Sequence, residues 1–168
     1  MLDKDQIVTF DQMKDSIGTL VSLWSNIEKA LKEAISSLHS GESPKSVHGI
    51  SRSINVWSLA IISDDPNRSL QTMLCRRLVT QLTEALTIRN LVCHGLTGIS
   101  AKPHNDSPEA CLRVQLGEDA RTLTWSQLNT MFRWMVDCQY LINDLTKSAM
   151  RNDAKKAENN LLSWRNYP

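Results

Sequence analysis

Apolar residues recur every three or four positions over most of the chain, which is the spacing of an amphipathic α-helix. Gly18 interrupts the first such stretch and is expected to break or kink it. Ser40 and Gly41 are expected to end the second stretch. The long central helix is expected to begin at Asn67 or Ser69. The predicted helices cover residues 3–16, 19–39, about 47–61, 67 or 69 to 95, and about 125–150.

The pattern changes after the central helix, where apolar and polar residues alternate. Leu112, Val114 and Leu116 are separated by single polar residues, as in a strand with one buried face. The pattern also predicts a turn, a returning strand, a third short strand and a surface loop with two prolines. These four segments are residues 117–120, 121–123, 96–101 and 102–108, respectively.

The predicted fold is mainly α, an up-and-down helix bundle with a small β-hairpin or sheet inserted at about residues 96–123. Thr124 and Gln127 have the spacing of a capping box, which places the start of the last long helix. Residues 1–150 form one helical domain in this prediction. Residues 151–168 are a polar C-terminal tail that is expected to fray, although Leu161, Leu162, Trp164 and Tyr167 could dock.

Arg89 stands where the long central helix should present an apolar residue. With about 100° per residue, it projects into the middle of an apolar stripe. A guanidinium stays charged in a protein, and burying it unpaired costs several kcal/mol or more. Arg89 therefore needs a carboxylate partner or a polar cleft. The apolar stripe consists of Leu74, Leu78, Leu82, Ala85, Leu86 and Val92.

His94 follows five residues after Arg89, and Gly95 then offers a left-handed C-cap at which the helix can end. An imidazole at a helix end is not fixed by continuous helical geometry, so we expect His94 to be able to turn toward Arg89. A cation and a titratable base close together, with no metal-ligand spacing around them, suit phosphodiester chemistry.

The run Arg89, Asn90, three further residues and His94 ends a long amphipathic helix and precedes Gly95. It resembles the RxxxxH motif of HEPN domains, which are all-helical and often metal-independent ribonucleases, common in toxin–antitoxin and phage-defence systems. The resemblance covers the organisation of residues 1–150, with residue-level identity in the motif. One toxin group of the family has a tyrosine two residues after the motif histidine, where this chain has Leu96.

The resemblance implies a homodimer in which two motif helices meet and form one cleft that binds RNA and cleaves it without a metal or cofactor. The 2′-hydroxyl of the RNA would attack the neighbouring phosphodiester. His94 would move protons, and Arg89 would bind the scissile phosphate and stabilise the transition state. Asn90 would orient the histidine, bind phosphate or be solvated. An antitoxin or another protein is a further expected partner.

Two other hypotheses stay open. In the first, a non-catalytic HEPN-like module binds a nucleotide, RNA or a partner protein through the same cleft. In the second, the chain is a helical interaction protein whose Arg89 forms a structural ion pair with a carboxylate such as Glu28 or Asp137.

Composition narrows the class of protein. The net charge of +1 over 168 residues argues against a large non-specific nucleic-acid surface, but allows a small local RNA site. Neither a signal peptide nor an apolar run of membrane-spanning length is apparent. Four scattered cysteines without a CxxC pair predict reduced thiols in a cytoplasmic protein, and zinc is not expected.

Overall fold

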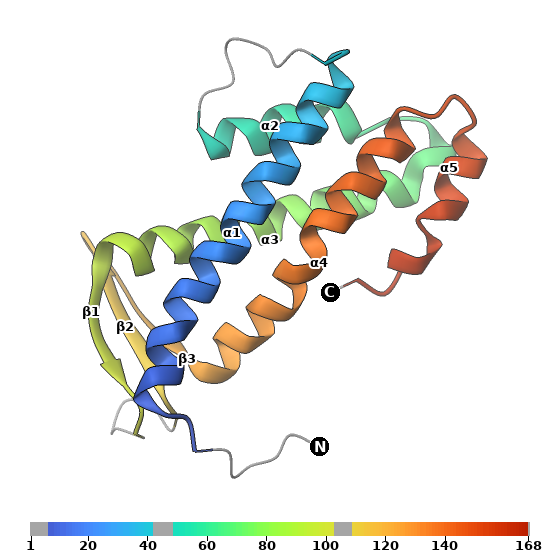
Figure 1. The fold of residues 1–168 in the computed structure, drawn as a ribbon. Helices are drawn as coiled ribbons and strands as arrows, with labels where there is room; N and C mark the ends of the chain where they lie inside the picture. The colour runs from blue at the N-terminus through green and yellow to red at the C-terminus, as the bar shows by residue number, and fades with distance from the viewer. Residues whose placement is uncertain (1–6, 42–48, 103–108, 168) are drawn as a thin grey trace. The chain divides into compact units, whose positions relative to one another are not determined.

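The computed structural model describes residues 7–41, 49–102 and 109–167, which are mainly helical and include a small three-stranded antiparallel sheet (Figure 1). They divide into two compact units. Unit 1 takes in the described parts of 1–24 and 86–133, and unit 2 those of 25–85 and 134–168. In chain order the elements are α1 (Phe10–Leu38), α2 (Ile50–Ile61), η1 (Pro66–Arg68), α3 (Ser69–Gly95), β1 (Leu96–Ser100), β2 (Cys111–Leu116), β3 (Asp119–Thr124), α4 (Trp125–Ala149), α5 (Ala154–Asn160) and η2 (Leu162–Trp164).

The first helix continues through Gly18, so the predicted break there is wrong. A glycine inside a helix costs roughly 1 kcal/mol relative to alanine. That cost is outweighed because buried side chains continue at helical spacing on both sides, with Met13 before the glycine and Leu20 and Trp24 after it. The unfavourable helix propensity of one glycine is therefore smaller than the stabilisation from burying a whole face of the helix.

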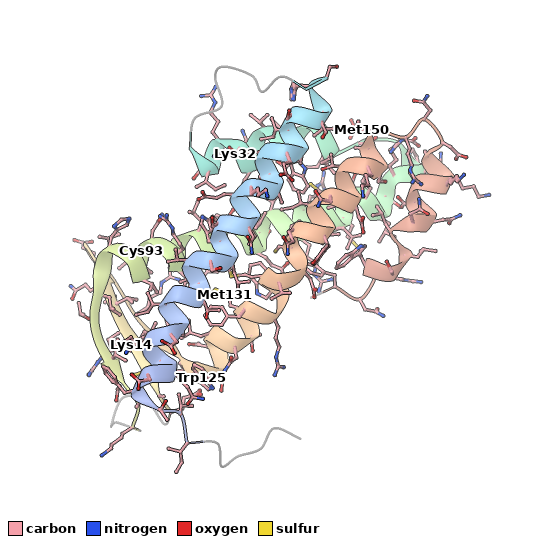
Figure 2. The ribbon with its side chains drawn as sticks, in the orientation of Figure 1. Lys14, Lys32, Cys93, Trp125, Met131 and Met150 are labelled. Atoms are coloured by element: carbon pink, nitrogen blue, oxygen red, sulfur yellow. The ribbon has the colours of Figure 1, made fainter. Side chains whose placement is uncertain are left out.

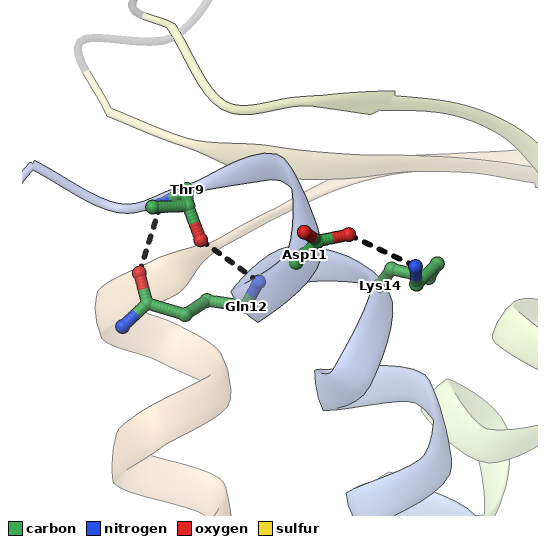
Figure 3. Close-up of polar contacts among 4 residues, drawn as sticks. All are labelled: Thr9, Asp11, Gln12 and Lys14. Carbon is green, nitrogen blue, oxygen red and sulfur yellow. Dashed lines mark hydrogen bonds and ion pairs between the residues drawn. The ribbon is translucent and has the colours of Figure 1, made fainter.

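A capping box that the sequence analysis missed starts α1. The backbone N–H of Thr9 donates to Gln12 Oε1 at 2.8 Å, and the backbone N–H of Gln12 donates to Thr9 Oγ1 at 3.1 Å (Figure 3). An exposed ion pair joins Asp11, in the first turn of α1, to Lys14 at 2.9 Å (Figure 3). The helix predicted over residues 3–16 begins outside the described residues, which start at residue 7.

The end of α1 is confirmed at the predicted place. Ser40 and Gly41 have φ values of 59° and 95°, in the left-handed region. The Gly41 N–H donates to the Ser36 carbonyl at 2.8 Å, which satisfies one of the carbonyls that a helix end leaves free. Residues 42–48, where the next helix was predicted to begin, lie outside the described residues.

The predicted β insertion in unit 1 is confirmed as a sheet of order β1-β2-β3, with both neighbouring pairs antiparallel. Leu116 pairs with Asp119, so the hairpin turn has only Gly117 and Glu118 at its centre and is tighter than predicted. Gly117 has a φ of 62°, which a two-residue hairpin turn requires. Residues 103–108 of the predicted loop lie outside the described residues.

Alternation along β2 is confirmed at Leu112 and Val114, which are buried, whereas Leu116 at the hairpin end is 46% exposed. The predicted capping box of α4 is also confirmed. The Thr124 N–H donates to Gln127 Oε1 at 3.0 Å, and the Gln127 N–H donates to Thr124 Oγ1 at 3.3 Å.

The junction between α3 and β1 has no connecting loop, and Gly95 does not form the predicted left-handed C-cap. The positive-φ glycines of the described residues are at positions 41, 49 and 117. Gly95 is needed for another reason, because a Cβ at this position would lie 2.4 Å from the Gln115 carbonyl oxygen and 2.7 Å from its carbon. Glycine therefore allows the backbones of α3 and β2 to approach each other.

The C-terminal segment packs into unit 2, so the predicted fraying after residue 150 is wrong and the docking of its apolar residues is confirmed for Leu161 and Tyr167. Leu161 is fully buried, and Tyr167 is 5% exposed. Trp164 Nε1 donates to Asp144 Oδ2 at 2.9 Å. The Glu158 carboxylate accepts from the backbone N–H groups of Leu70 and Gln71 and so caps the first turn of α3.

Buried polar contacts in unit 2 also join α2, α3 and α4. Gln71 is 1% exposed; its Oε1 accepts from Ser148 Oγ at 2.7 Å and from Arg68 Nη1 at 3.1 Å, while its Nε2 donates to the Ile61 carbonyl at 2.7 Å. Trp57 Nε1 donates to Thr146 Oγ1 at 3.0 Å. These pairs satisfy groups that would be costly to bury alone.

The two glycines of α1 and α3 give a matched test of this account. Gly95→Ala should lower the free energy of unfolding by about 1–3 kcal/mol, because the new methyl group overlaps the Gln115 carbonyl. Gly18→Ala should raise it by up to about 1 kcal/mol, because no atom beyond its chain neighbours and the nearby backbone of its own helix lies within 4 Å of the new Cβ, and alanine favours the helix. Urea unfolding followed by circular dichroism measures both. Equal effects of the two substitutions would contradict the close approach at Gly95.

Candidate functional site

The last three turns of α3, in unit 1, place the predicted site residues. Arg89 is half-buried, in the turn before the buried residues Leu91 and Val92. Its Nη1 donates to Asn90 Oδ1 at 3.1 Å. Its Nε is buried and finds no hydrogen-bond partner among the described residues. A desolvated donor on a cation that cannot be deprotonated is costly unless an acceptor is supplied.

Asn90 contacts the arginine. It is half-buried, and its amide oxygen accepts from Arg89, so its side chain is not merely solvated. No hydrogen bond joins Asn90 to His94 among the described residues, so its predicted role in orienting the histidine is not supported. Its predicted role in binding phosphate stays a prediction. Asn90 engages Nη1, so Nε and Nη2 are the guanidinium nitrogens for which no hydrogen-bond partner is observed among the described residues.

His94 is exposed and lies in the last turn of α3. The helix continues to Gly95, so the expectation that helical geometry does not fix His94 is wrong. Five residues of α-helix turn a side chain by about 140° and move it about 7.5 Å along the axis. Helical geometry therefore directs the imidazole away from the Arg89 guanidinium within one protomer.

The ion-pair hypothesis for Arg89 stays a prediction. Arg89 belongs to unit 1, whereas the two carboxylates suggested as partners, Glu28 and Asp137, belong to unit 2. Within unit 1, the observed contact of the guanidinium is the hydrogen bond to Asn90.

The four cysteines are free thiols in two kinds of surroundings. Cys75, Cys111 and Cys138 are buried, and burial raises the pKa of Cys75 and of Cys138 to about 12 in each case. Cys93 is exposed beside His94 in the last turn of α3 (Figure 2). Neighbouring residues on a helix point about 100° apart, so Cys93 and His94 do not make a nucleophile and base pair.

In the part of the chain that the structure describes, no group of three or more His, Cys, Asp or Glu side chains is arranged to hold a metal ion. None of the described helices combines the length and apolar character that crossing a bilayer requires.

The sheet adds a cation that sequence reasoning passed over. Arg113 appeared in the sequence only as a polar position in an alternating strand. In the structure it is exposed on β2, opposite Gly98 of β1. The sequence pattern could have identified Arg113 as an arginine at an outward position of a strand. That Gly98 lies opposite it could not be predicted, because this depends on how the strands pair.

The different surroundings of the cysteines predict selective thiol reactivity. In the folded protein, an aromatic disulfide reagent should modify Cys93 quickly and the three buried thiols at least about tenfold more slowly, because thiolate and access are both required. The measurement is the number of thiols released with time, for wild type and for Cys93→Ser. A fast phase that persists in Cys93→Ser would show that another thiol is accessible.

Comparison with known proteins gives no match: no protein-family model, no curated protein and no solved structure corresponds to this chain. The HEPN resemblance therefore rests on Arg89, Asn90 and His94 and on their helical surroundings.

Proposed function

We propose that this chain is a metal-independent endoribonuclease of the HEPN type that acts as a homodimer. The observation that carries the proposal is the state of Arg89. Its Nη1 is held by Asn90, and its buried Nε has no acceptor among the described residues. Two oxygens of a phosphate match the Nε and Nη2 edge of a guanidinium, so a phosphodiester that reaches this arginine would satisfy the buried Nε.

The proposed reaction divides the chemistry between the two motif residues. The 2′-oxygen of the RNA forms a bond to phosphorus while the bond from phosphorus to the 5′-oxygen breaks. His94 accepts the proton of the 2′-hydroxyl or protonates the leaving 5′-oxygen. Arg89 stabilises the negative charge that gathers on the phosphate oxygens. The products are a 2′,3′-cyclic phosphate and a 5′-hydroxyl end.

A homodimer follows from the helix geometry in this proposal. Within one protomer the side chains of Arg89 and His94 start about 140° apart around α3. A second copy related by a two-fold axis can bring its own motif helix alongside, so that the guanidinium of one protomer meets an imidazole of the other. The exposure of His94 supports this arrangement, since the imidazole is accessible to a partner or a substrate.

A toxin–antitoxin or phage-defence effector is the biological role that the resemblance favours, with an antitoxin or another protein as regulator. The second candidate function is a non-catalytic module that binds a nucleotide or RNA. The direction of His94 away from Arg89 favours it, because an anion can bind at Arg89 without the imidazole. The net charge of +1 is also compatible with a small ligand.

RNA cleavage in EDTA tests the nuclease directly. Wild-type protein should leave cyclic phosphate ends, and His94→Ala should lower the rate by about 100-fold or more, because general acid–base catalysis is lost. His39→Ala is the matched control: like His94, His39 is exposed near the end of a helix, and its ring bonds only to the Ile35 carbonyl of α1 among the described residues.

The outcomes separate the two candidates. If His94→Ala cleaves RNA as fast as wild type, the assigned base is wrong. If neither protein cleaves any RNA class, but RNA or a nucleotide binds and Arg89→Ala abolishes that binding, the non-catalytic module is the better description.

Mixing two inactive variants tests the shared cleft. Arg89→Ala and His94→Ala should each be inactive alone, while a mixture that has exchanged subunits should recover about a quarter of the wild-type rate, because half of its dimers are mixed and one of the two composite sites of each mixed dimer keeps both groups. Arg76→Ala, an exposed arginine of the same helix, serves as the active control. Mixtures that form mixed dimers, shown by native mass spectrometry, yet stay inactive would place both groups of the site in one protomer.

A further inference from the structure

Arg113 projects from the solvent-facing side of the sheet in unit 1. Its neighbours along β2, Leu112 and Val114, are buried, whereas Arg113 is exposed. Successive side chains of a strand point to opposite faces, so Arg113 belongs to the face opposite Leu112 and Val114. This face is uncovered at Arg113 and Gln115, whereas Cys111 at its end is buried. Its cross-strand neighbours are Gly98 on β1 and Thr122 on β3, both small.

The guanidinium of Arg113 lies over Gly98. A Cβ added at Gly98 would be 3.3 Å from Arg113 Nε and 3.6 Å from Arg113 Nη2. The pairing of β1 with β2 is irregular between Leu96 and Gly98, and Thr97 Oγ1 donates to the Arg113 carbonyl at 3.1 Å. The missing side chain and the irregular pairing together direct Arg113 toward β1, the strand that leaves the motif helix (Figure 1).

The charge of Arg113 is not neutralised within the described residues. The ion pair of this hairpin joins Arg121 to Asp119 at 3.0 Å, and no carboxylate of the described chain lies within ion-pair distance of Arg113. The remaining acid of the hairpin, Glu118, is exposed at the turn, at the opposite end of β2 from Cys111. The middle of the uncovered face therefore has one free cation between short, uncharged side chains.

This cation lies close to the motif. Gly95 follows His94 directly and touches the Gln115 backbone, since the Cβ position of Gly95 is 2.4 Å from the Gln115 carbonyl oxygen. Arg113 is two residues further along β2, about 7 Å at the rise of a strand. A stacked nucleic-acid strand has a phosphate roughly every 3.4 Å of its axis, so the separation corresponds to about two nucleotides.

We infer that the uncovered face of the β1-β2-β3 sheet holds the single strand of RNA that leads to His94, and that Arg113 binds one of its phosphates there. This inference rests on the proposed function for the identity of the ligand. Arg113 is a positioning residue in it: the guanidinium holds the strand next to the reacting nucleotide and takes no part in proton transfer.

The test measures RNA binding with cleavage suppressed. A fluorescein-labelled single-stranded RNA of mixed sequence is titrated with His94→Ala protein at several salt concentrations, and fluorescence anisotropy gives the Kd. Adding Arg113→Ala should weaken binding about tenfold and reduce the slope of log affinity against log salt by about 0.7, because one phosphate contact is lost. Adding Gly98→Val should also weaken binding, since the valine side chain occupies the space under the guanidinium while the net charge stays the same.

Arg121→Ala is the matched control, because Arg121 belongs to the same sheet but is already paired with Asp119. It should leave the salt slope unchanged. Equal losses for Arg121→Ala and Arg113→Ala would reduce the effect to net charge and overturn the inference. Unchanged RNA affinity in Arg113→Ala would overturn the inference as well. So would an Arg113→Ala protein that binds RNA normally but no longer forms the dimer, because the face would then be a contact between two copies of the chain.

The outcomes also separate this inference from the proposed function. If wild type cleaves RNA while Arg113→Ala binds it normally, the nuclease stands and the sheet face is not its RNA surface. If wild type never cleaves RNA but Arg113 and Gly98 control its binding, the surface stands and the chain is an RNA-binding module. If wild type does not bind RNA at all, both are wrong.

Discussion

The carbonyl of Gln115 lies so close to Gly95 that no side chain fits between them, and the candidate site of unit 1 depends on this approach. It allows α3 to pass into β1 without a loop, so the helix keeps its geometry to its last residue. The motif residues are therefore fixed by a rigid element, with His94 one residue before the junction. The same approach sets the Gln115 backbone of β2 beside the end of the motif helix, and Arg113 lies two residues from Gln115 along this strand.

The positive charge of unit 1 near the motif comes from two arginines whose donors or charge are only partly paired among the described residues. Arg89 gives one guanidinium nitrogen to Asn90 and keeps another buried and unsatisfied among the described residues. Arg113 has its charge exposed over a glycine, with no carboxylate of the described chain to neutralise it. In a protein with a net charge of +1, such local arrangements decide anion binding more than the total charge does. Both arginines suit the same chemical group, a phosphodiester.

In unit 2, several buried or half-buried polar groups are paired with one another. Glu158 caps the first turn of α3, and the buried Gln71 has its donor and acceptor groups satisfied by Ile61, Arg68 and Ser148. Burial raises the pKa of Tyr167 above its ordinary value, and Cys138 next to it raises it further, so the phenol stays protonated as part of the packing. Satisfied groups of this kind stabilise a fold.

Local patterns in the sequence determined the long helices, the three strands and the Thr124 and Gln127 capping box, because periodicity and capping act over a few residues. The same patterns identified Arg89 as an arginine within an apolar stripe. Only the tertiary structure decided that α1 continues through Gly18, that Gly95 serves a close approach instead of a cap, and that the tail packs around Leu161 and Tyr167. The same holds for the position of Arg113 over Gly98. Each of these outcomes depends on atoms that are distant in sequence, and the free energy of such contacts is set by packing and desolvation, which no local pattern contains.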